Sequence, residues 1–262
     1  MHDADDVADA VMHAFARETR LSETSFVQSP EAEGADYRHR IFMASGEIPF
    51  AGHPSLGTAA AVARQRGESR ATYVQQTRPG LQPVDVEAEG LVSRVSMLQQ
   101  RAVFGPELDP GEVLPLVGLE AGDADPRLPP QVVSTGVEQV LVQVDDPARL
   151  TRLLPDYPRI GALLAEHGAI VLYLSAVDAE HGTARARAFT GSAELGEDPA
   201  TGAAAGPLCA HVAARTGVEA LEIDQGVEMR RPSRLQAALE GDRVRVGGDV
   251  VVVVEGTVHL DA

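Results

Sequence analysis

Two segments far apart in the chain carry the same pattern of residues. The first reads Glu47-Ile-Pro-Phe-Ala-Gly-His-Pro-Ser-Leu-Gly-Thr-Ala-Ala-Ala, and the second reads Glu197-Asp-Pro-Ala-Thr-Gly-Ala-Ala-Ala-Gly. In each, an acidic residue and a Gly/Pro turn precede a predicted helix that is rich in alanine and glycine. Repetition of this kind indicates that the chain contains two copies of one domain.

Small residues on both helices allow close backbone packing, so each helix can be enclosed by a sheet that wraps around it. The N-terminus of each helix would present unpaired N–H groups, which suit a carboxylate or a phosphate. If the two copies face each other across a cleft, the two helix N-termini would converge on one anionic ligand. This convergence is a hypothesis from the pattern alone.

Length and composition limit the class of protein. The chain has 262 residues, 44% of them hydrophobic and 23% charged, which suits a soluble protein of one large or two small domains. Its longest aliphatic run, Val250–Val254, is far too short to cross a bilayer. The acidic N-terminus does not resemble a signal peptide, so we predict a cytoplasmic protein with no membrane partner.

Charge and residue usage exclude several kinds of chemistry. The net charge of −17 argues against binding to nucleic acid and favours a small molecule or another subunit as the partner. All 22 basic residues are arginines, so lysine-based Schiff bases and phosphate loops are excluded. Cys209 is the single cysteine, which excludes an internal disulfide and a cysteine-cluster metal site. We expect neither a metal nor a cofactor.

Periodicity predicts an alternation of helices and short strands. The predicted helices are 3–19, 54–66, 112–116, 147–154, 160–167 and 204–215. The predicted strands are 25–28, 37–42, 71–76, 81–88, 91–98, 138–144, 169–174, 184–189, 227–230, 234–238, 243–246 and 250–254. A shift to Pro, Gly and Asp between residues 105 and 130 predicts a domain junction. We therefore predict domains at 1–105 and 106–262, with the last strand able to pack back on the first domain.

Several motifs resemble the PhzF family, which is related in fold to diaminopimelate epimerase. The matching blocks, in the family's order, are Arg20-Leu-Ser-Glu-Thr-Ser-Phe-Val27, Arg40-Ile-Phe42, Glu47-Ile-Pro-Phe-Ala-Gly-His-Pro54, Glu197-Asp-Pro-Ala-Thr-Gly202 and Gln225-Gly-Val-Glu-Met229. The resemblance implies an α+β fold of two similar domains, each a curved, mostly antiparallel or mixed sheet around a central helix. It also implies an active site between the domains and a homodimer.

The resemblance implies a cofactor-independent isomerase. The family's characterised reaction is a proton shift on a dihydro-3-hydroxyanthranilate in phenazine biosynthesis, in which a glutamate removes and returns a proton. That glutamate corresponds to Glu23, while His53 and Asp198 correspond to polar residues that contact the substrate and assist the transfer. The adjoining residues assigned to substrate binding are Gly52, Thr201, Gly202 and Ala203. The natural substrate is expected to be a small cyclic or unsaturated carboxylate.

Each candidate also has an ordinary structural explanation. Glu23 could be a solvated residue between a helix and a strand, and His53 could cap the backbone at a turn. Asp198 could be the N-cap of the helix that follows Pro199. Glu47 is expected to orient the neighbouring turn, and Cys209 to pack as a small hydrophobe.

The sequence also departs from the family pattern. Ala203 stands where members often carry a ligand-contacting serine, and Met43-Ala44 replaces the usual Thr-Pro. Members usually have an opening strand and a Gly-Asn-Pro turn before the first helix, and this sequence contains no asparagine. An unpaired sheet edge or an open cleft wall is therefore expected unless another segment replaces that strand.

Two other functions are alternatives to a proton-shifting isomerase. A racemase that uses two thiols is excluded because Cys209 cannot supply the pair. A non-catalytic or weakly active homodimer that binds a small molecule remains the alternative, and ligand binding without turnover would identify it.

Overall fold

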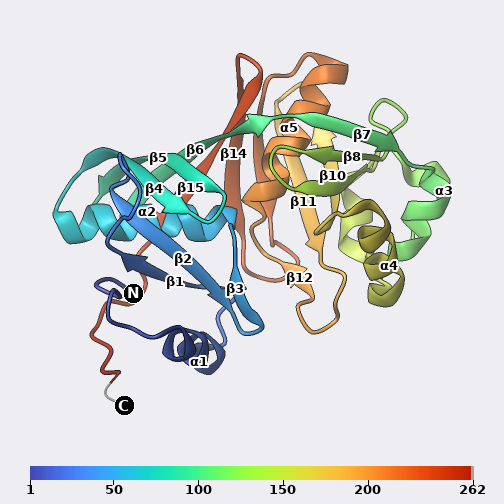
Figure 1. The fold of residues 1–262 in the computed structure, drawn as a ribbon. Coiled ribbons are helices and arrows are strands. Elements are labelled where there is room, and N and C mark those ends of the chain that lie inside the picture. Colours follow the sequence, from blue (N-terminus) through green and yellow to red (C-terminus); the bar gives the residue numbers. More distant parts are fainter. Residues whose placement is uncertain (261–262) are drawn as a thin grey trace. The chain divides into compact units, whose positions relative to one another are not determined.

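The computed structural model describes residues 1–260 and divides into two units (Figure 1). Unit 1 comprises Met1–Met97 together with the chain from Gly247 onward, and unit 2 comprises Leu98–Val246. The chain passes from one unit to the other inside two strands, β6 (Val92–Arg101) and β15 (Arg243–Val251). The change of composition predicts one junction near residue 105. No loop marks the passage at Met97, because β6 runs through it.

Unit 1 consists of one curved sheet and two helices. The helices are α1 (Asp9–Thr19) and α2 (Gly52–Arg66), and the remaining strands are β1 (Thr24–Gln28), β2 (Tyr37–Met43), β3 (Gly46–Ile48), β4 (Arg70–Thr77) and β5 (Gly80–Glu89). The strand order is β1-β2-β4-β5-β6-β15, and β3 pairs with β2. The β2–β4 pair is parallel, whereas β1–β2, β2–β3, β4–β5 and β5–β6 are antiparallel.

Helix α2 is the centre of unit 1. It packs against β1, β2, β4 and β5, and its buried residues, among them Leu56, Ala59, Val62 and Ala63, cover most of its circumference. Small residues allow this close packing, whereas the stripe that begins at His53 is not buried. The helix ends at Gly67, whose φ of 70° gives the left-handed cap that glycine favours.

Backbone from the first residues covers the outer edge of β1. The Val27 N–H donates to Met1 O at 2.9 Å, and the Ala4 N–H donates to Val27 O at 3.0 Å. The helix begins at Asp9 instead of Asp3, because Met1 and Ala4 bond to the strand and the chain turns at Asp5 and Asp6 before the helix. The sheet edge that we expected to be unpaired is bonded at this point.

Unit 2 repeats the arrangement with α5 (Gly202–Thr216) at its centre. The other helical segments are α3 (Pro110–Val113), η1 (Leu114–Val117), η2 (Ala121–Asp123), η3 (Pro147–Arg152) and α4 (Tyr157–His167). The strands are β7 (Val103–Glu107), β8 (Gln131–Ser134), β9 (Glu138–Gln143), β10 (Leu172–Asp178), β11 (Thr183–Phe189), β12 (Glu197–Asp198), β13 (Ala220–Gln225) and β14 (Ser233–Glu240). The order is β15-β14-β13-β11-β10-β9-β8-β7, and β12 pairs with β11.

The central elements of the two units correspond. In unit 1 the short strand β3 pairs antiparallel with β2, and in unit 2 β12 pairs antiparallel with β11. In each unit the short strand leads into the central helix, and the next long strand of the sheet runs parallel to β2 or β11. Helix α5 packs against β8, β9, β13 and β14. This duplication confirms the predicted α+β fold of two similar domains, each with a mixed sheet around a central helix.

Three strand predictions differ from the structure. Residues 227–230 form a turn, and the strand of this region is β13, which precedes it. Residues 243–246 and 250–251, predicted as parts of two strands, belong to one strand, β15, and residues 252–254 lie beyond its end. Gly247 lies within β15. The position requires glycine, because a Cβ there would be 2.6 Å from the Val95 carbonyl oxygen. The glycine therefore permits a close approach of backbone and does not form a turn.

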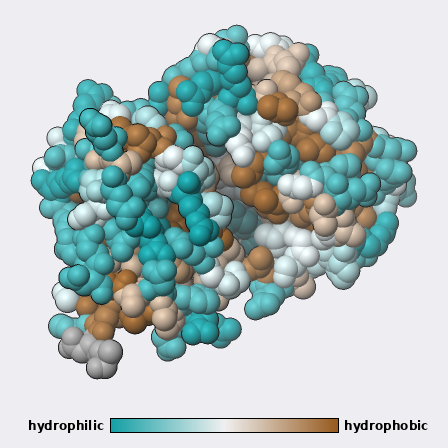
Figure 2. Space-filling view, in the orientation of Figure 1, coloured by the Kyte–Doolittle hydropathy of each residue, from teal (hydrophilic) through white to brown (hydrophobic). Residues whose placement is uncertain are grey.

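The surface agrees with the acidic composition. Figure 2 shows hydrophilic residues over most of the visible face of each unit. Within residues 1–260, no helix is both long enough and apolar enough to cross a membrane.

Candidate functional site

Glu23 and His53 meet in unit 1. Glu23 lies just before β1, and His53 is the second residue of α2. The Glu23 Oε2 atom is 2.8 Å from the His53 Nε2 atom, with side chains 14% and 44% exposed. Glu23 Oε2 is buried and accepts no hydrogen bond from another group within residues 1–260. Its short contact with the His53 imidazole is therefore its polar interaction. A carboxylate and an imidazole at this distance can exchange a proton.

A pocket of about 470 Å³ adjoins this pair. Its apolar lining includes Phe15, Leu21, Val27, Pro54 and Ala61. Its polar lining includes the hydroxyls of Ser25 and Thr58 besides Glu23 and His53. Gly57 and Pro54 bring the first turns of α2 to the pocket wall. The pocket thus combines an apolar wall with the Glu23–His53 pair and a further histidine, His2, and a mixture of apolar and polar groups is usual in a small-molecule site.

A buried histidine supports the pocket from within the sheet. His39 on β2 is 3% exposed. As the Gln75 amide is oriented, its oxygen accepts from His39 Nδ1 at 3.0 Å, so Nε2 is left to accept. The hydroxyls of Ser25 and Thr58 lie 2.9 and 3.1 Å from Nε2. Burial lowers the pKa of His39 to about 4, so the ring is neutral and its two ring nitrogens have different roles.

The remaining candidates except Gly52 lie in unit 2, at or just before the start of α5. Asp198 is the last residue of β12, Thr201 is the N-cap residue of α5, and Gly202 and Ala203 open the helix. The Thr201 hydroxyl donates to Asp198 Oδ2 at 2.6 Å. Asp198 is therefore not the N-cap, because its carboxylate binds a side chain and not a backbone N–H of the helix. Gly52 holds the place in α2 that Gly202 holds in α5, directly beside His53.

Sequence reasoning missed two residues of this network. Gln225 and Tyr173 are both fully buried, and the Tyr173 hydroxyl donates to Gln225 Oε1 at 3.0 Å. Gln225 also bonds Thr201 and the backbone of Asp198. The available signal was a glutamine at the end of an alternating strand, immediately before a glycine, in one of the blocks that resembles the family.

The motif Arg-x-Phe is a second feature whose role the sequence did not reveal. Arg40 donates to both Glu47 oxygens, at 2.8 and 2.9 Å, and Arg187 donates to both Glu197 oxygens, at 2.8 and 2.6 Å. In each unit the arginine also lies over the phenylalanine two residues on. These ion pairs hold β3 against β2 and β12 against β11. The two short strands lead to the two central helices. Glu47 thus orients the turn, as expected.

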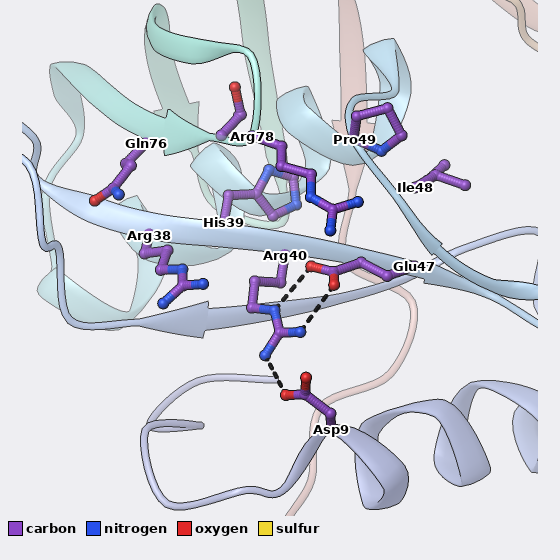
Figure 3. A pocket seen from close by; sticks show the side chains of 10 residues that line it. Asp9, Arg38, His39, Arg40, Glu47, Ile48, Pro49, Gln76 and Arg78 are labelled. Atoms are coloured by element: carbon purple, nitrogen blue, oxygen red, sulfur yellow. Dashed lines mark hydrogen bonds and ion pairs between the residues drawn. The ribbon is translucent and has the colours of Figure 1, made fainter.

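A second pocket surrounds the first of these pairs (Figure 3). It has a volume of about 400 Å³ and is lined by Arg38, Arg40, Arg78, Asp9 and Glu47, among others. Figure 3 shows Arg40 between the Glu47 carboxylate and Asp9, which it contacts at 2.6 Å. Hydrogen bonds from Arg40 lower the pKa of both carboxyls below their usual values. The positive charge of Arg40 is thus paired with the carboxylates of Asp9 and Glu47.

Within residues 1–260, no group of three or more His, Cys, Asp and Glu side chains has an arrangement that could hold a metal ion. Cys209 is buried, and its burial raises the pKa of the thiol to about 11. It packs in the core of unit 2, as its type suggested.

Comparisons with known proteins show the family of the chain. The family model described as phenazine biosynthesis-like protein matches residues 1–256. A trans-2,3-dihydro-3-hydroxyanthranilate isomerase of Pseudomonas aeruginosa is 35% identical over 98% of this chain and 91% of its own length. A solved structure from Pseudomonas aeruginosa, described as a predicted epimerase, is 30% identical with a TM-score of 0.81, and the match covers 97% of this chain and 92% of that one.

A second solved structure, a phenazine biosynthesis protein of the PhzF family from Bacillus anthracis, is 26% identical. Its TM-score is also 0.81, and the match covers 96% of this chain and 91% of that chain. The match extends over both units and includes the elements that carry Glu23, His53 and Asp198. The chain therefore belongs to the phenazine biosynthesis-like, or PhzF, family of isomerases.

Proposed function

We propose that this protein is a cofactor-independent isomerase that shifts a proton on a small cyclic or unsaturated carboxylate by general acid/base catalysis. The observation that carries the proposal is the contact between Glu23 and His53 beside a pocket of about 470 Å³. The names of its relatives support an isomerase, and the trans-2,3-dihydro-3-hydroxyanthranilate isomerases supply a substrate to use as a probe.

Glu23 is the proposed base and acid. Its carboxylate takes a proton from one substrate carbon, the electron pair left behind moves the double bond, and the same carboxyl returns a proton to another carbon. No atom is gained or lost, so the reaction is an isomerisation without a co-reactant. His53, 2.8 Å from Glu23, holds the carboxylate and can relay the proton.

Asp198 has a supporting role in this proposal. Two observations support this role. The family resemblance assigns Asp198 to the site, and the Thr201 hydroxyl fixes its carboxylate in unit 2 by donating to Oδ2. Gly52, Gly202 and Ala203, at the first turns of the two central helices, are proposed to contact the substrate with backbone and small side chains. Helix N-termini favour anionic groups, which suits a carboxylate substrate.

The first experiment is an exchange assay of the wild-type protein. The protein is incubated with trans-2,3-dihydro-3-hydroxyanthranilate in D₂O, and ¹H NMR follows loss of substrate and appearance of deuterium at carbon. With the protein present, we expect deuterium from the solvent at a carbon of the product that carries only ordinary hydrogen in a sample without protein. Saturable binding without exchange, for this probe and for related cyclic carboxylates, would instead identify the non-catalytic alternative. Cytoplasmic location and a homodimer remain predictions, and light scattering of the purified chain tests the second.

A further inference from the structure

The buried amide of Gln225 is fully occupied by the turn that carries Asp198. Gln225 is the last residue of β13 and is 0% exposed. Its Oε1 accepts from the Thr201 backbone N–H at 3.1 Å and from the Tyr173 hydroxyl at 3.0 Å. Its Nε2 donates to the Asp198 carbonyl oxygen at 2.7 Å and to the Thr201 hydroxyl at 2.9 Å. A glutamine side chain can offer two acceptor and two donor directions, and all four are used here.

The backbone partners fix which way the amide faces. The Thr201 N–H can only donate, and the Asp198 carbonyl can only accept, so the oxygen and nitrogen of Gln225 cannot be exchanged without losing both bonds. This orientation then dictates the direction of the next bond. Because Nε2 donates to the Thr201 oxygen, the Thr201 hydrogen is free to point at Asp198 Oδ2, 2.6 Å away.

Glycine at the next position brings the two segments together. Gly226 has a φ of 75°, and a Cβ on it would lie 2.8 Å from the Pro199 carbonyl oxygen and 2.3 Å from the Arg231 carbonyl oxygen. The backbone after β13 therefore lies directly against the residue that follows Asp198. Tyr173 closes the other side, and burial raises the pKa of its hydroxyl, so it remains a donor.

We propose that Gln225 is a positioning residue, which orients the Asp198 carboxylate by fixing the Thr201 hydroxyl as a donor to one carboxylate oxygen. Within residues 1–260 no hydrogen bond is made to the other oxygen, Oδ1, so it is available to a substrate. The inference rests on the proposed function, in which Asp198 assists the proton transfer. It assigns to a fully buried side chain a role that acts only through Thr201 and Asp198.

The test compares Gln225→Met with Gln225→Glu, using the D₂O exchange assay at several pH values. Gln225→Met has a similar volume but neither donates nor accepts, so kcat should fall about 10²-fold at every pH. A buried carboxyl beside Asp198 favours its neutral form, which can still donate one hydrogen bond. Gln225→Glu should therefore recover much of its kcat at low pH and lose it as the pH rises. A general loss of packing would give no such pH dependence.

Gln139→Met is the matched control. Gln139 is also fully buried in unit 2, but its amide donates to the Val137 carbonyl oxygen. This variant should retain the wild-type kcat and pH profile. If Gln139→Met and Gln225→Met lose the same activity, or if Gln225→Met loses none, Gln225 is not a positioning residue.

Hydrogen exchange of the Thr201 amide separates this inference from the proposed function. Its N–H donates to Gln225, so its exchange should become at least about tenfold faster in Gln225→Met and stay unchanged in Gln139→Met. If the wild type shows no turnover, the proposed function fails, and this measurement alone decides the positioning role. An unchanged Thr201 amide in folded Gln225→Met would overturn it.

Discussion

At the scale of single residues, the most informative feature is an ion pair that occurs twice. Arg40–Glu47 and Arg187–Glu197 occupy equivalent places in the two units, and each ties a short strand to the long strand beside it. Arg187 and Glu197 are each 11% exposed, and Arg187 also donates to the Leu150 carbonyl oxygen. Burial removes water from both charges, and this cost offsets most of their attraction. Such a pair therefore fixes the geometry more than it adds stability.

Removing one member of the buried pair should therefore be costly. We predict that Arg187→Met lowers the unfolding free energy by about 3 kcal/mol, because Glu197 is left buried without its partner. Urea denaturation measures this change. Arg234→Met is the control, since Arg234 is 60% exposed in its pairs with Asp224 and Glu222 and should cost less than about 1 kcal/mol. Equal losses in the two variants would contradict the account of the buried pair.

The residues of the site were predictable to different degrees. The resemblance selected Glu23 and His53, and the structure brings them into contact. Whether they catalyse remains a prediction. Gln225 escaped notice because a lone glutamine in a strand has no local pattern that distinguishes a buried amide from a solvated one. Its function depends on Thr201 and Asp198, which precede it in the chain and meet it only in the fold.

At the scale of elements, close approach of backbones explains where the sequence was misread. The sequence predicts separate strands on either side of Gly247 and Gly248, yet Gly247 lies within a continuous strand against Val95 and Ser96. Glycine serves both purposes, and the sequence alone does not say which. Helices α2, α4 and α5, in contrast, were predicted within three residues at each end, because their small and apolar positions recur over several turns, whereas α1 begins six residues later than predicted. Short strands such as β3 and β12 are too short to show a period.

A glycine in α4 provides an element-scale prediction. Glycine is a poor helix former, so alanine in a helix interior normally stabilises by about 0.5–1 kcal/mol. At Gly161, however, a Cβ would lie 2.7 Å from the Gly191 carbonyl oxygen, in the loop that leads to β12. Gly161→Ala should therefore lower the unfolding free energy by about 1–3 kcal/mol, as overpacking does.

The contrasting variant is Gly57→Ala in α2. A Cβ at Gly57 meets nothing within 4 Å, so this change should raise the unfolding free energy. Thermal or urea denaturation compares the two variants directly. A stabilised Gly161→Ala protein would show that α4 does not press on this loop as the structure describes.

At the scale of the whole molecule, two buried histidines link folding to pH. Burial lowers the pKa of His39 to about 4 and of His211 to about 3, from an ordinary value of 6.5. Between the folded-state pKa of each histidine and 6.5, the unfolded chain binds a proton at that histidine and the folded protein does not. The unfolding free energy should therefore fall as the pH falls from 6.5 toward 4, by about 1.4 kcal/mol per pH unit for each histidine.

His39→Asn isolates one of the two contributions. The variant is less stable than wild type in absolute terms if it disturbs the bonds to Gln75 and Ser25. Its slope of stability against pH should nevertheless be smaller than that of the wild type by about 1.4 kcal/mol per pH unit. Urea denaturation between pH 6.5 and 4.5 gives both slopes, and identical slopes would show that His39 is not buried as a neutral ring.

The central claim is that the Glu23 carboxyl carries the proton, and Glu23→Gln in the D₂O assay tests it most directly. Glutamine keeps the shape of the side chain and removes the titrating group, so deuterium incorporation should fall by about 10²–10⁴-fold while the fold is retained. Glu33→Gln, at an exposed glutamate of the same unit, should exchange at the wild-type rate. Glu23→Gln exchanging as fast as wild type would contradict the account.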